Sequence, residues 1–186
     1  MSTIEIVVKG STATADTGDL VRSAKSDLTH FGALYDRHVQ SIYRYIYSRV
    51  GSQAQAEDIT SQTFLAAMEA LPSYREQGHF RAWLFTIARR KVIDHYRQRK
   101  PESPVDVREV QANTSDPLQK VIRKEAFAQL HAMIAELTEF ECELIRLRYV
   151  AELPFAEIGR LVGKSEGAAK KALYRLLDRL QTEGTE

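Results

Sequence analysis

Lysine and arginine side chains gather in two stretches of this sequence, and such clusters are suited to binding phosphate groups. Residues 89–100 contain six Lys or Arg and a single acid, Asp94, although the net charge of the whole chain is only +1. A second group of cations lies within residues 164–175. Taken alone, a basic run is also compatible with a solvated helix end, where the helix dipole favours cations. The secondary structure in which each cluster lies is therefore needed to decide between phosphate binding and a solvated helix end.

The first cluster belongs to a predicted helix over residues 80–100, a run without Gly or Pro that changes from apolar and aromatic to basic. At 100° per residue, its apolar and basic side chains fall on opposite sides. The apolar side comprises Phe80, Trp83, Leu84, Ile87, Ala88 and Val92, and the basic side comprises Arg89, Arg90, Arg97 and Lys100. One side is expected to pack on a core and the other to meet an anionic partner.

The second cluster lies in a pattern typical of a helix-turn-helix, from Pro154 to Leu180. A short helix, FAEIGRLV, is followed by a break at Gly163 and by Ser165, which is expected to cap a longer helix. The outward side of that helix is predicted to carry Lys170, Lys171, Tyr174 and Arg175, and the inward side Ala169, Ala172, Leu173, Leu176, Leu177 and Leu180. An ordinary helical hairpin with a solvated basic side is the alternative. The agreement of cap, turn, lengths and polarity favours DNA binding.

Two further helices are predicted upstream. Residues 1–26 show no sustained period and are interpreted as a flexible N-terminal extension. A helix capped by Asp27 is expected to end at Gly51, and a second one, with a capping box between Ser52 and Gln55, to end before Pro72. The outward side of this second helix is acidic with an apolar residue in its middle, and it consists of Asp58, Gln62, Leu65 and Glu69.

The domain organisation follows from the breaks in these patterns. Residues 101–116 are polar and contain Pro101 and Pro104, which predicts a linker between helical domains at 27–100 and 117–186. In the second domain, Thr138 and Glu141 are expected to form a capping box. With 5 Pro and 9 Gly in 186 residues, and with long helical periodicities, the predicted fold class is all-α.

Several classes of protein are disfavoured by composition. The single cysteine, Cys142, excludes an intrachain disulfide and a cysteine-rich zinc site. No apolar run approaches the roughly 18 residues of a membrane span, so a cytoplasmic protein is expected. The five histidines show no ligand spacing, and Glu57 and Asp58 point to different sides of one helix. We therefore expect no enzyme activity, no cofactor and no metal site.

Taken together, these motifs resemble a known family. AEDITSQTF, FRAWLFTIARRKVIDHYRQRK and LPFAEIGRLVGKSEGAAKKALYRLL occur in the order and with the spacing of bacterial sigma factors of the extracytoplasmic-function (ECF) group. The resemblance covers roughly residues 28–180 and both predicted domains. It implies a protein that binds core RNA polymerase, recognises the −10 and −35 promoter elements and assists promoter melting. It also implies an anti-sigma factor as a partner.

The resemblance assigns roles to individual residues. It implies that Asp58, Gln62, Leu65 and Glu69 bind the clamp of the largest polymerase subunit. The loop at residues 73–79 would take an extruded base of the −10 element, with Tyr74 as a stacking surface, and the whole −10 set is Tyr74, Arg75, Gln77, His79, Arg81, Arg89, Arg90 and Arg97. The −35 duplex would be contacted by Lys164, Ser165, Lys170, Lys171, Tyr174 and Arg175.

One alternative function stays open from the sequence. A one-component helix-turn-helix regulator that does not bind core polymerase would explain Pro154 to Leu180. It would leave the basic helix, the acidic face and the linker without a role. A nucleic-acid-processing enzyme would need a convergent set of carboxylate or histidine ligands, which the spacing does not provide.

Overall fold

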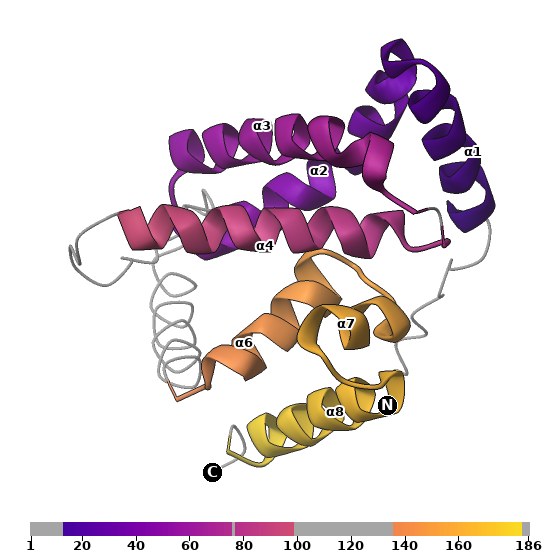
Figure 1. The fold of residues 1–186 in the computed structure, drawn as a ribbon. Coiled ribbons are helices and arrows are strands. Elements are labelled where there is room, and N and C mark those ends of the chain that lie inside the picture. Colours follow the sequence, from indigo (N-terminus) through magenta and orange to yellow (C-terminus); the bar gives the residue numbers. More distant parts are fainter. Residues whose placement is uncertain (1–12, 76, 99–135, 184–186) are drawn as a thin grey trace, which may run out of the picture. The chain divides into compact units, whose positions relative to one another are not determined.

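The computed structural model describes residues 13–75, 77–98 and 136–183, and the chain divides into two compact units, residues 1–100 and 101–186. Every element within the described ranges is helical (Figure 1), so the predicted all-α class is confirmed. The predicted linker, the helix start at Pro117 and the cation Lys100 lie outside the described residues.

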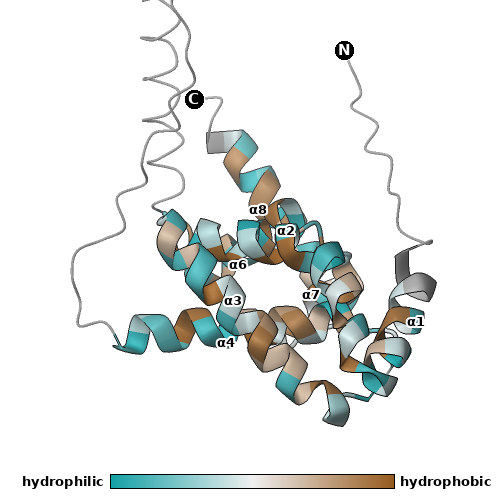
Figure 2. Ribbon diagram, turned by 90° about the horizontal axis from the view of Figure 1, so that it is seen from above, coloured by the Kyte–Doolittle hydropathy of each residue, from teal (hydrophilic) through white to brown (hydrophobic). Residues whose placement is uncertain are grey.

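Four α-helices build the described part of the first unit: α1 (Ala13–Ser26), α2 (Phe31–Val50), α3 (Gln53–Ala70) and α4 (Phe80–Gln98). Short 3₁₀ turns at Leu28–His30 and Leu71–Ser73 precede α2 and follow α3. Helices α2, α3 and α4 pack on one another, and α1 packs on α2 and α4. Along the helices in Figure 2, hydrophobic and hydrophilic residues alternate, as expected when each helix buries one side.

The core of this unit is formed by the periodic apolar positions of the three long helices. Tyr45 on α2 meets Phe85 on α4 edge to face, with ring centroids 5.4 Å apart, and both rings are buried. The inward side of α3 and the turn that follows it contribute Ala56, Ile59, Thr63, Phe64, Ala67 and Leu71, all of which are buried. Burying one large apolar side chain contributes about 1.5–3 kcal/mol, so these stripes position the exposed sides of the same helices.

The N-terminal segment differs from the sequence interpretation. Residues 13–26, expected to have no regular structure, form helix α1, in which Val21 and Ala24 are completely buried. Two small buried residues make a weak periodic signal, and a helix of 14 residues is marginal by itself in water. Packing against α2 and α4 supplies the stability that the local sequence lacks.

Two helix starts in this unit also differ in detail. Asp27 caps the 3₁₀ turn: its Oδ1 accepts a hydrogen bond from the Thr29 amide at 2.9 Å, and this bond lowers the pKa of the Asp27 carboxyl. Ser52 occupies the N-cap of α3 but makes no side-chain capping bond, so the capping box predicted there is wrong. The Gln55 side chain lies instead 3.3 Å from Nε2 of His95 on α4, a tertiary contact that competes with the local one.

The second unit contains α6 (Glu139–Ile145), a π-helical turn (Arg146–Val150), α7 (Phe155–Val162) and α8 (Glu166–Glu183) within its described part. The capping box predicted at the start of α6 is confirmed, since the Thr138 amide donates to Glu141 at 2.9 Å and the Glu141 amide donates back to the Thr138 hydroxyl at 3.3 Å. The core of the described part of this unit includes Leu144, Leu147, Ala151, Leu153, Ile158, Ala169, Leu173 and Leu176.

The buried His38 on α2 provides the first testable prediction. Burial together with the nearby Arg81 and Arg37 lowers its pKa to about 4, and its ring lies 5.6 Å from that of Phe80. The unfolded chain therefore binds more protons than the folded chain between about pH 4 and 6.5, so the free energy of unfolding should rise with pH in this window, by about 3 kcal/mol.

Urea denaturation of the full chain, followed by the fluorescence of its single tryptophan, Trp83, measures this dependence. In His38→Leu the rise between pH 4 and 6.5 should be smaller by that amount. An unchanged slope in His38→Leu would show that this histidine does not titrate as its environment indicates.

Candidate nucleic-acid and protein interfaces

Helix α3 presents one exposed acidic strip. Asp58, Gln62, Leu65 and Glu69 are all exposed, and we refer to these four residues as the α3 face. The Gln62 side-chain amide donates to Asp58 Oδ2 at 2.9 Å, which orders the N-terminal part of the strip. Leu65, in the middle, is 56% exposed although it is a large apolar residue. The outward placement predicted from the sequence is confirmed, and the combination of acids with an exposed leucine suits a protein partner.

The α3 face borders a polar groove between α3 and α4. Its lining consists of Asp58, Gln62, Lys91, Asp94, His95, Arg97 and Gln98. The groove is lined by two acids, Asp58 and Asp94, and by the cations Lys91 and Arg97 of α4. The acidic face and the basic end of α4 are therefore adjacent surfaces of one unit, which the sequence did not reveal.

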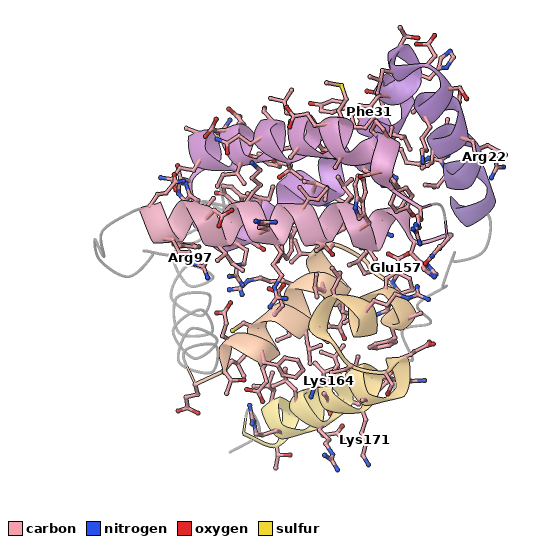
Figure 3. All side chains as sticks on the ribbon, in the orientation of Figure 1. Arg22, Phe31, Arg97, Glu157, Lys164 and Lys171 are labelled. Atoms are coloured by element: carbon pink, nitrogen blue, oxygen red, sulfur yellow. The ribbon has the colours of Figure 1, made fainter. Side chains whose placement is uncertain are left out.

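Helix α4 carries the predicted DNA-binding cations with unequal exposure. Arg90 and Arg97 are exposed, whereas Arg81 and Arg89 are half-buried. Arg97 lies near the C-terminal end of the described helix (Figure 3). The Arg90 guanidinium is 4.0 Å from Asp94, but its side chain is 85% exposed, and an ion pair of this kind contributes little to stability. Arg90 and Arg97 are therefore available to an anionic partner at small structural cost.

The loop between α3 and α4 corrects one predicted role. Tyr74 is buried, and its ring packs against Trp83 at 4.7 Å and Phe80 at 5.6 Å between centroids. Both neighbours belong to the apolar start of α4, and they leave the Tyr74 ring almost no exposed surface. The prediction of Tyr74 as a stacking surface for an extruded base is therefore wrong in this structure. Arg75 and Gln77 are exposed and His79 is half-buried, and the contacts to −10 DNA predicted for these three residues stay predictions.

Helices α7 and α8 form the predicted helix-turn-helix. Gly163 ends α7 in the left-handed region with φ of 67°, and the Lys164 amide donates to the Gly159 carbonyl at 2.8 Å. Ser165 caps α8 as expected, since its Oγ accepts from the Ala168 amide at 3.2 Å. The turn thereby determines where α8 starts relative to α7.

The outward side of α8 is as predicted, since Lys170, Lys171, Tyr174 and Arg175 are exposed. Of the predicted inward residues, Ala169, Leu173 and Leu176 are buried, whereas Ala172, Leu177 and Leu180 are half-buried. Figure 3 shows Lys171 directed away from α6 and α7. Lys164 and Ser165 are also exposed, at the N-terminal end of the helix. This exposed basic surface, with a helix N-terminus beside it, suits contacts to DNA phosphates and base edges.

The orientation of Tyr174 depends on residues outside the predicted site. The Arg148 guanidinium lies 4.8 Å above the Phe155 ring and donates to the Leu153 carbonyl at 3.0 Å. Phe155 in turn lies 6.2 Å from the ring of Tyr174, centroid to centroid. Arg148 and Phe155 thus support an exposed residue of α8 from the preceding elements. No local pattern indicates this contact, because it joins three separate segments.

Gly159 is a second residue of the turn whose importance the sequence pattern did not indicate. A Cβ at this position would lie 2.7 Å from the Lys164 carbonyl oxygen and 3.1 Å from the Glu166 amide nitrogen. The only local signal is a glycine in the middle of a short helix, which often indicates close backbone approach. The absence of a side chain at Gly159 lets the turn lie against α7.

Gly159→Ala should therefore destabilise the second unit, by about 1–3 kcal/mol, because backbone atoms would have to move to admit the methyl group. Gly167→Ala is the matched control: nothing lies within 4 Å of its added Cβ, and alanine is the better helix former by about 1 kcal/mol. Amide hydrogen exchange of α7 and α8 reports both effects. Equal exchange in the two variants would contradict the close approach.

Within the described ranges, no group of three His, Cys, Asp or Glu residues is arranged to hold a metal ion. None of the described helices is long and apolar enough to cross a membrane.

Comparison with known proteins gives matches along both units. The family described as Sigma-70 region 2 matches residues 34–102, and the family described as Sigma-70, region 4 matches residues 127–180. The chain is 32% identical over 150 residues to the ECF RNA polymerase sigma factor SigD of Mycobacterium tuberculosis, covering 76% of this chain and 71% of SigD. It is 38% identical over 161 residues to the ECF RNA polymerase sigma factor BldN of Streptomyces coelicolor, covering 83% of this chain but only 60% of BldN.

A solved structure agrees with these sequence matches. CnrH, determined in complex with the cytosolic domain of CnrY, is similar with a TM-score of 0.64 and 25% identity, and the match covers 89% of this chain and 94% of the other. The matches to regions 2 and 4 follow one another along the chain as the two units do.

Proposed function

This chain belongs to the ECF family of RNA polymerase sigma factors, and from this premise we propose that it binds core polymerase, recognises −10 and −35 promoter elements and assists duplex opening. The observation that carries the proposal is that each family match coincides with a unit that exposes a charged surface of the required sign. The catalytic steps of RNA synthesis belong to the polymerase. We place the chain where core polymerase works, in the cytoplasm.

The α3 face is the proposed contact with the clamp of the largest polymerase subunit. Its support is the exposure of all four residues and the presence of Leu65 at its centre. An exposed leucine surrounded by polar groups has the anatomy of a small protein interface, in which the apolar centre is desolvated and the charges set orientation. The acids also predict that the partner surface is basic.

The loop before α4 and the basic side of α4 are the proposed −10 site. Arg90 and Arg97 would hold the DNA backbone in register, while Gln77 and His79 would meet the edge of an extruded base. Extruding a base costs a few kcal/mol, and polar partners in the loop lower that cost. Arg75, Arg81 and Arg89 complete this set.

Helix α8 is the proposed reader of the −35 duplex. Its N-terminal half carries the exposed cations, and a recognition helix usually contacts base edges with its N-terminal residues. Lys164 and Ser165 lie at the helix start, where backbone amides favour a phosphate. Lys170, Lys171, Tyr174 and Arg175 follow along the exposed side.

An anti-sigma factor is the further proposed partner. CnrH, the structural relative, was determined bound to the cytosolic domain of CnrY. A protein that covered the α3 face or the exposed side of α8 would prevent polymerase or promoter binding by occlusion. We expect such a partner to compete with core polymerase for this chain.

The test of the function combines the purified full chain with core RNA polymerase and a duplex DNA library of random sequence. The mixture should form a stable complex, retain a subset of sequences with two conserved elements and produce RNA from them. Core polymerase alone is the control. A chain that binds selected DNA but forms no complex with core polymerase would support the one-component regulator instead.

A further inference from the structure

Helix α1 has no role in the assignments above. It precedes the matched family region, which begins at residue 34, yet it packs on α2 and α4 and completely buries Val21 and Ala24. Because α1 buries only a few side chains, we looked for a specific contact between this helix and one of the proposed binding surfaces.

One such contact joins α1 to the loop before α4. Nζ of Lys25 donates a hydrogen bond to the backbone carbonyl of Tyr74 at 2.6 Å, across 49 positions of the sequence and in a part-buried setting. Hydrogen bonds from a charged donor are shorter and stronger than neutral ones. The last turn of α1 therefore holds the backbone immediately before Arg75, an exposed residue of the proposed −10 loop.

Tyr74 is held from other directions as well. Its ring packs on Trp83 and Phe80, and its amide donates to the Leu71 carbonyl at 3.1 Å. Ring, amide and carbonyl are thus all engaged. The Lys25 bond is the one of these contacts that comes from outside the family-matched region.

Helix α1 is itself hydrogen-bonded to the 3₁₀ turn and to α2, so the backbone that carries Lys25 is held in place. The Asp27 amide donates to the Ser23 carbonyl at 2.9 Å, and Ser23 Oγ lies 2.9 Å from Nδ1 of His30. Farther along α1, Arg37 on α2 donates to the Thr17 hydroxyl at 3.2 Å. A side chain whose own support is fixed can position a binding loop more precisely than a freely moving one.

From this geometry we propose that helix α1, through the Lys25 hydrogen bond to Tyr74, positions the −10 loop and thereby contributes to selection of the −10 sequence. Lys25 is a positioning residue that acts through the loop backbone and does not itself contact a base. The proposal rests on the proposed sigma function for its effect on DNA, but its effect on the loop exists in the free chain.

The first experiment measures the loop in the free full-length chain, with three variants. Lys25→Met removes the ammonium and keeps the chain length, Lys25→Arg keeps a charged donor, and Arg22→Ala removes a neighbouring cation. Arg22 pairs with Asp19 within α1 and extends from the side of α1 away from α3 and α4 (Figure 3), so it is the matched control.

In Lys25→Met, the Tyr74 amide should exchange about tenfold faster, as expected for loss of one hydrogen bond to a charged group. Acrylamide should also quench Trp83, which packs on Tyr74, more strongly. Lys25→Arg and Arg22→Ala should resemble the wild type. Unchanged exchange in Lys25→Met, or faster exchange throughout α2–α4, would overturn the positioning role, the second because it would indicate general unfolding.

The second experiment uses the complex with core polymerase and single-stranded −10 DNA taken from sequences that the wild-type complex selects. Lys25→Met should lower the preference for the selected strand over a shuffled strand by roughly three- to tenfold, at or below the low end of the effect of losing a direct base contact, because Lys25 acts only through the loop backbone. Its affinity for core polymerase should not change. Lys25→Arg should restore the preference, and Arg22→Ala should retain it.

The outcomes separate the alternatives. A direct phosphate contact by Lys25 would weaken selected and shuffled strands equally and lower the salt slope by about one unit, which would overturn the proposal. If the wild-type chain fails to bind core polymerase, the sigma function is refuted. The hydrogen-exchange result on the free chain then tests the loop contact by itself. Loss of preference in Lys25→Met with rescue by Lys25→Arg confirms the inference.

Discussion

Asp58→Arg should reduce the affinity for core RNA polymerase by roughly 30-fold or more, because a reversed charge opposite a basic partner surface costs about 2 kcal/mol or more. Asp58 is exposed on α3, and its carboxylate accepts a hydrogen bond from Gln62, four residues along the same helix. The free energy of unfolding should therefore change little, by about 0.5 kcal/mol or less. Binding to fluorescently labelled core polymerase and urea denaturation measure the two quantities.

The adjacent Glu57 supplies a control with the same change in net charge. It is exposed, but it lies outside the α3 face, and its carboxylate accepts a hydrogen bond from Gln53 at 2.8 Å. Glu57→Arg should bind core polymerase nearly as well as the wild type. If both reversals weaken binding equally, the interaction depends on net charge, and the α3 face is not a specific interface.

Leu65 tests the same face without changing charge. Leu65→Ala removes apolar area that is exposed in the free chain, so the folded chain should lose almost no stability. In the complex with polymerase, the same change would remove a leucine side chain packed at the centre of the interface. We expect a loss of affinity of about 1–2 kcal/mol, or roughly fivefold to 30-fold. Full affinity in this variant would place the polymerase contact elsewhere.

Lys171→Ala and Arg175→Ala should each weaken promoter binding by about 1–3 kcal/mol if they contact base edges. The two residues lie four positions apart on the exposed side of α8, so they reach neighbouring parts of one groove. Loss of a base contact should also relax the preference at one −35 position. Loss of a phosphate contact should instead weaken all sequences equally and reduce the salt slope by about one unit.

Promoter affinity is measured with the polymerase complex at several salt concentrations on selected and substituted −35 sequences. Arg22→Ala, which removes one positive charge from the first unit, is the control for net charge and should have little effect. Both α8 variants should keep their affinity for core polymerase. Unaltered promoter binding in both would mean that the exposed side of α8 does not face DNA.

The features that the sequence predicted correctly are those that depend on residues close together along the chain. The capping box at Thr138 and Glu141, the turn at Gly163 and the cap at Ser165 each involve neighbours within four positions. The exposed α3 face follows from helical periodicity in the same way, because burying one side of α3 leaves the other in solvent. Helical periodicity, turns and the placement of charge along the chain are therefore predictable from the sequence alone.

Tertiary structure decided what depends on contacts between distant segments. Ser52 is a good capping residue by type, but its partner Gln55 turns to His95 on another helix. Tyr74 has the chemistry of a stacking surface, yet burial against Phe80 and Trp83 removes it from that role. Local propensities are worth only about 0–1 kcal/mol per residue, whereas burying an aromatic ring contributes about 1.5–3 kcal/mol, so packing decides such conflicts.

The sequence by itself determined the all-α class, the helix-turn-helix and the acidic and basic surfaces, because periodicity and charge are properties of the chain. Only the tertiary structure revealed helix α1 as an ordered part of the first unit, and the bond from Lys25 to the Tyr74 carbonyl. That bond joins residues 49 positions apart, and no local pattern can indicate it. The physical reason is that a marginal helix acquires both its stability and its role from the surface on which it packs.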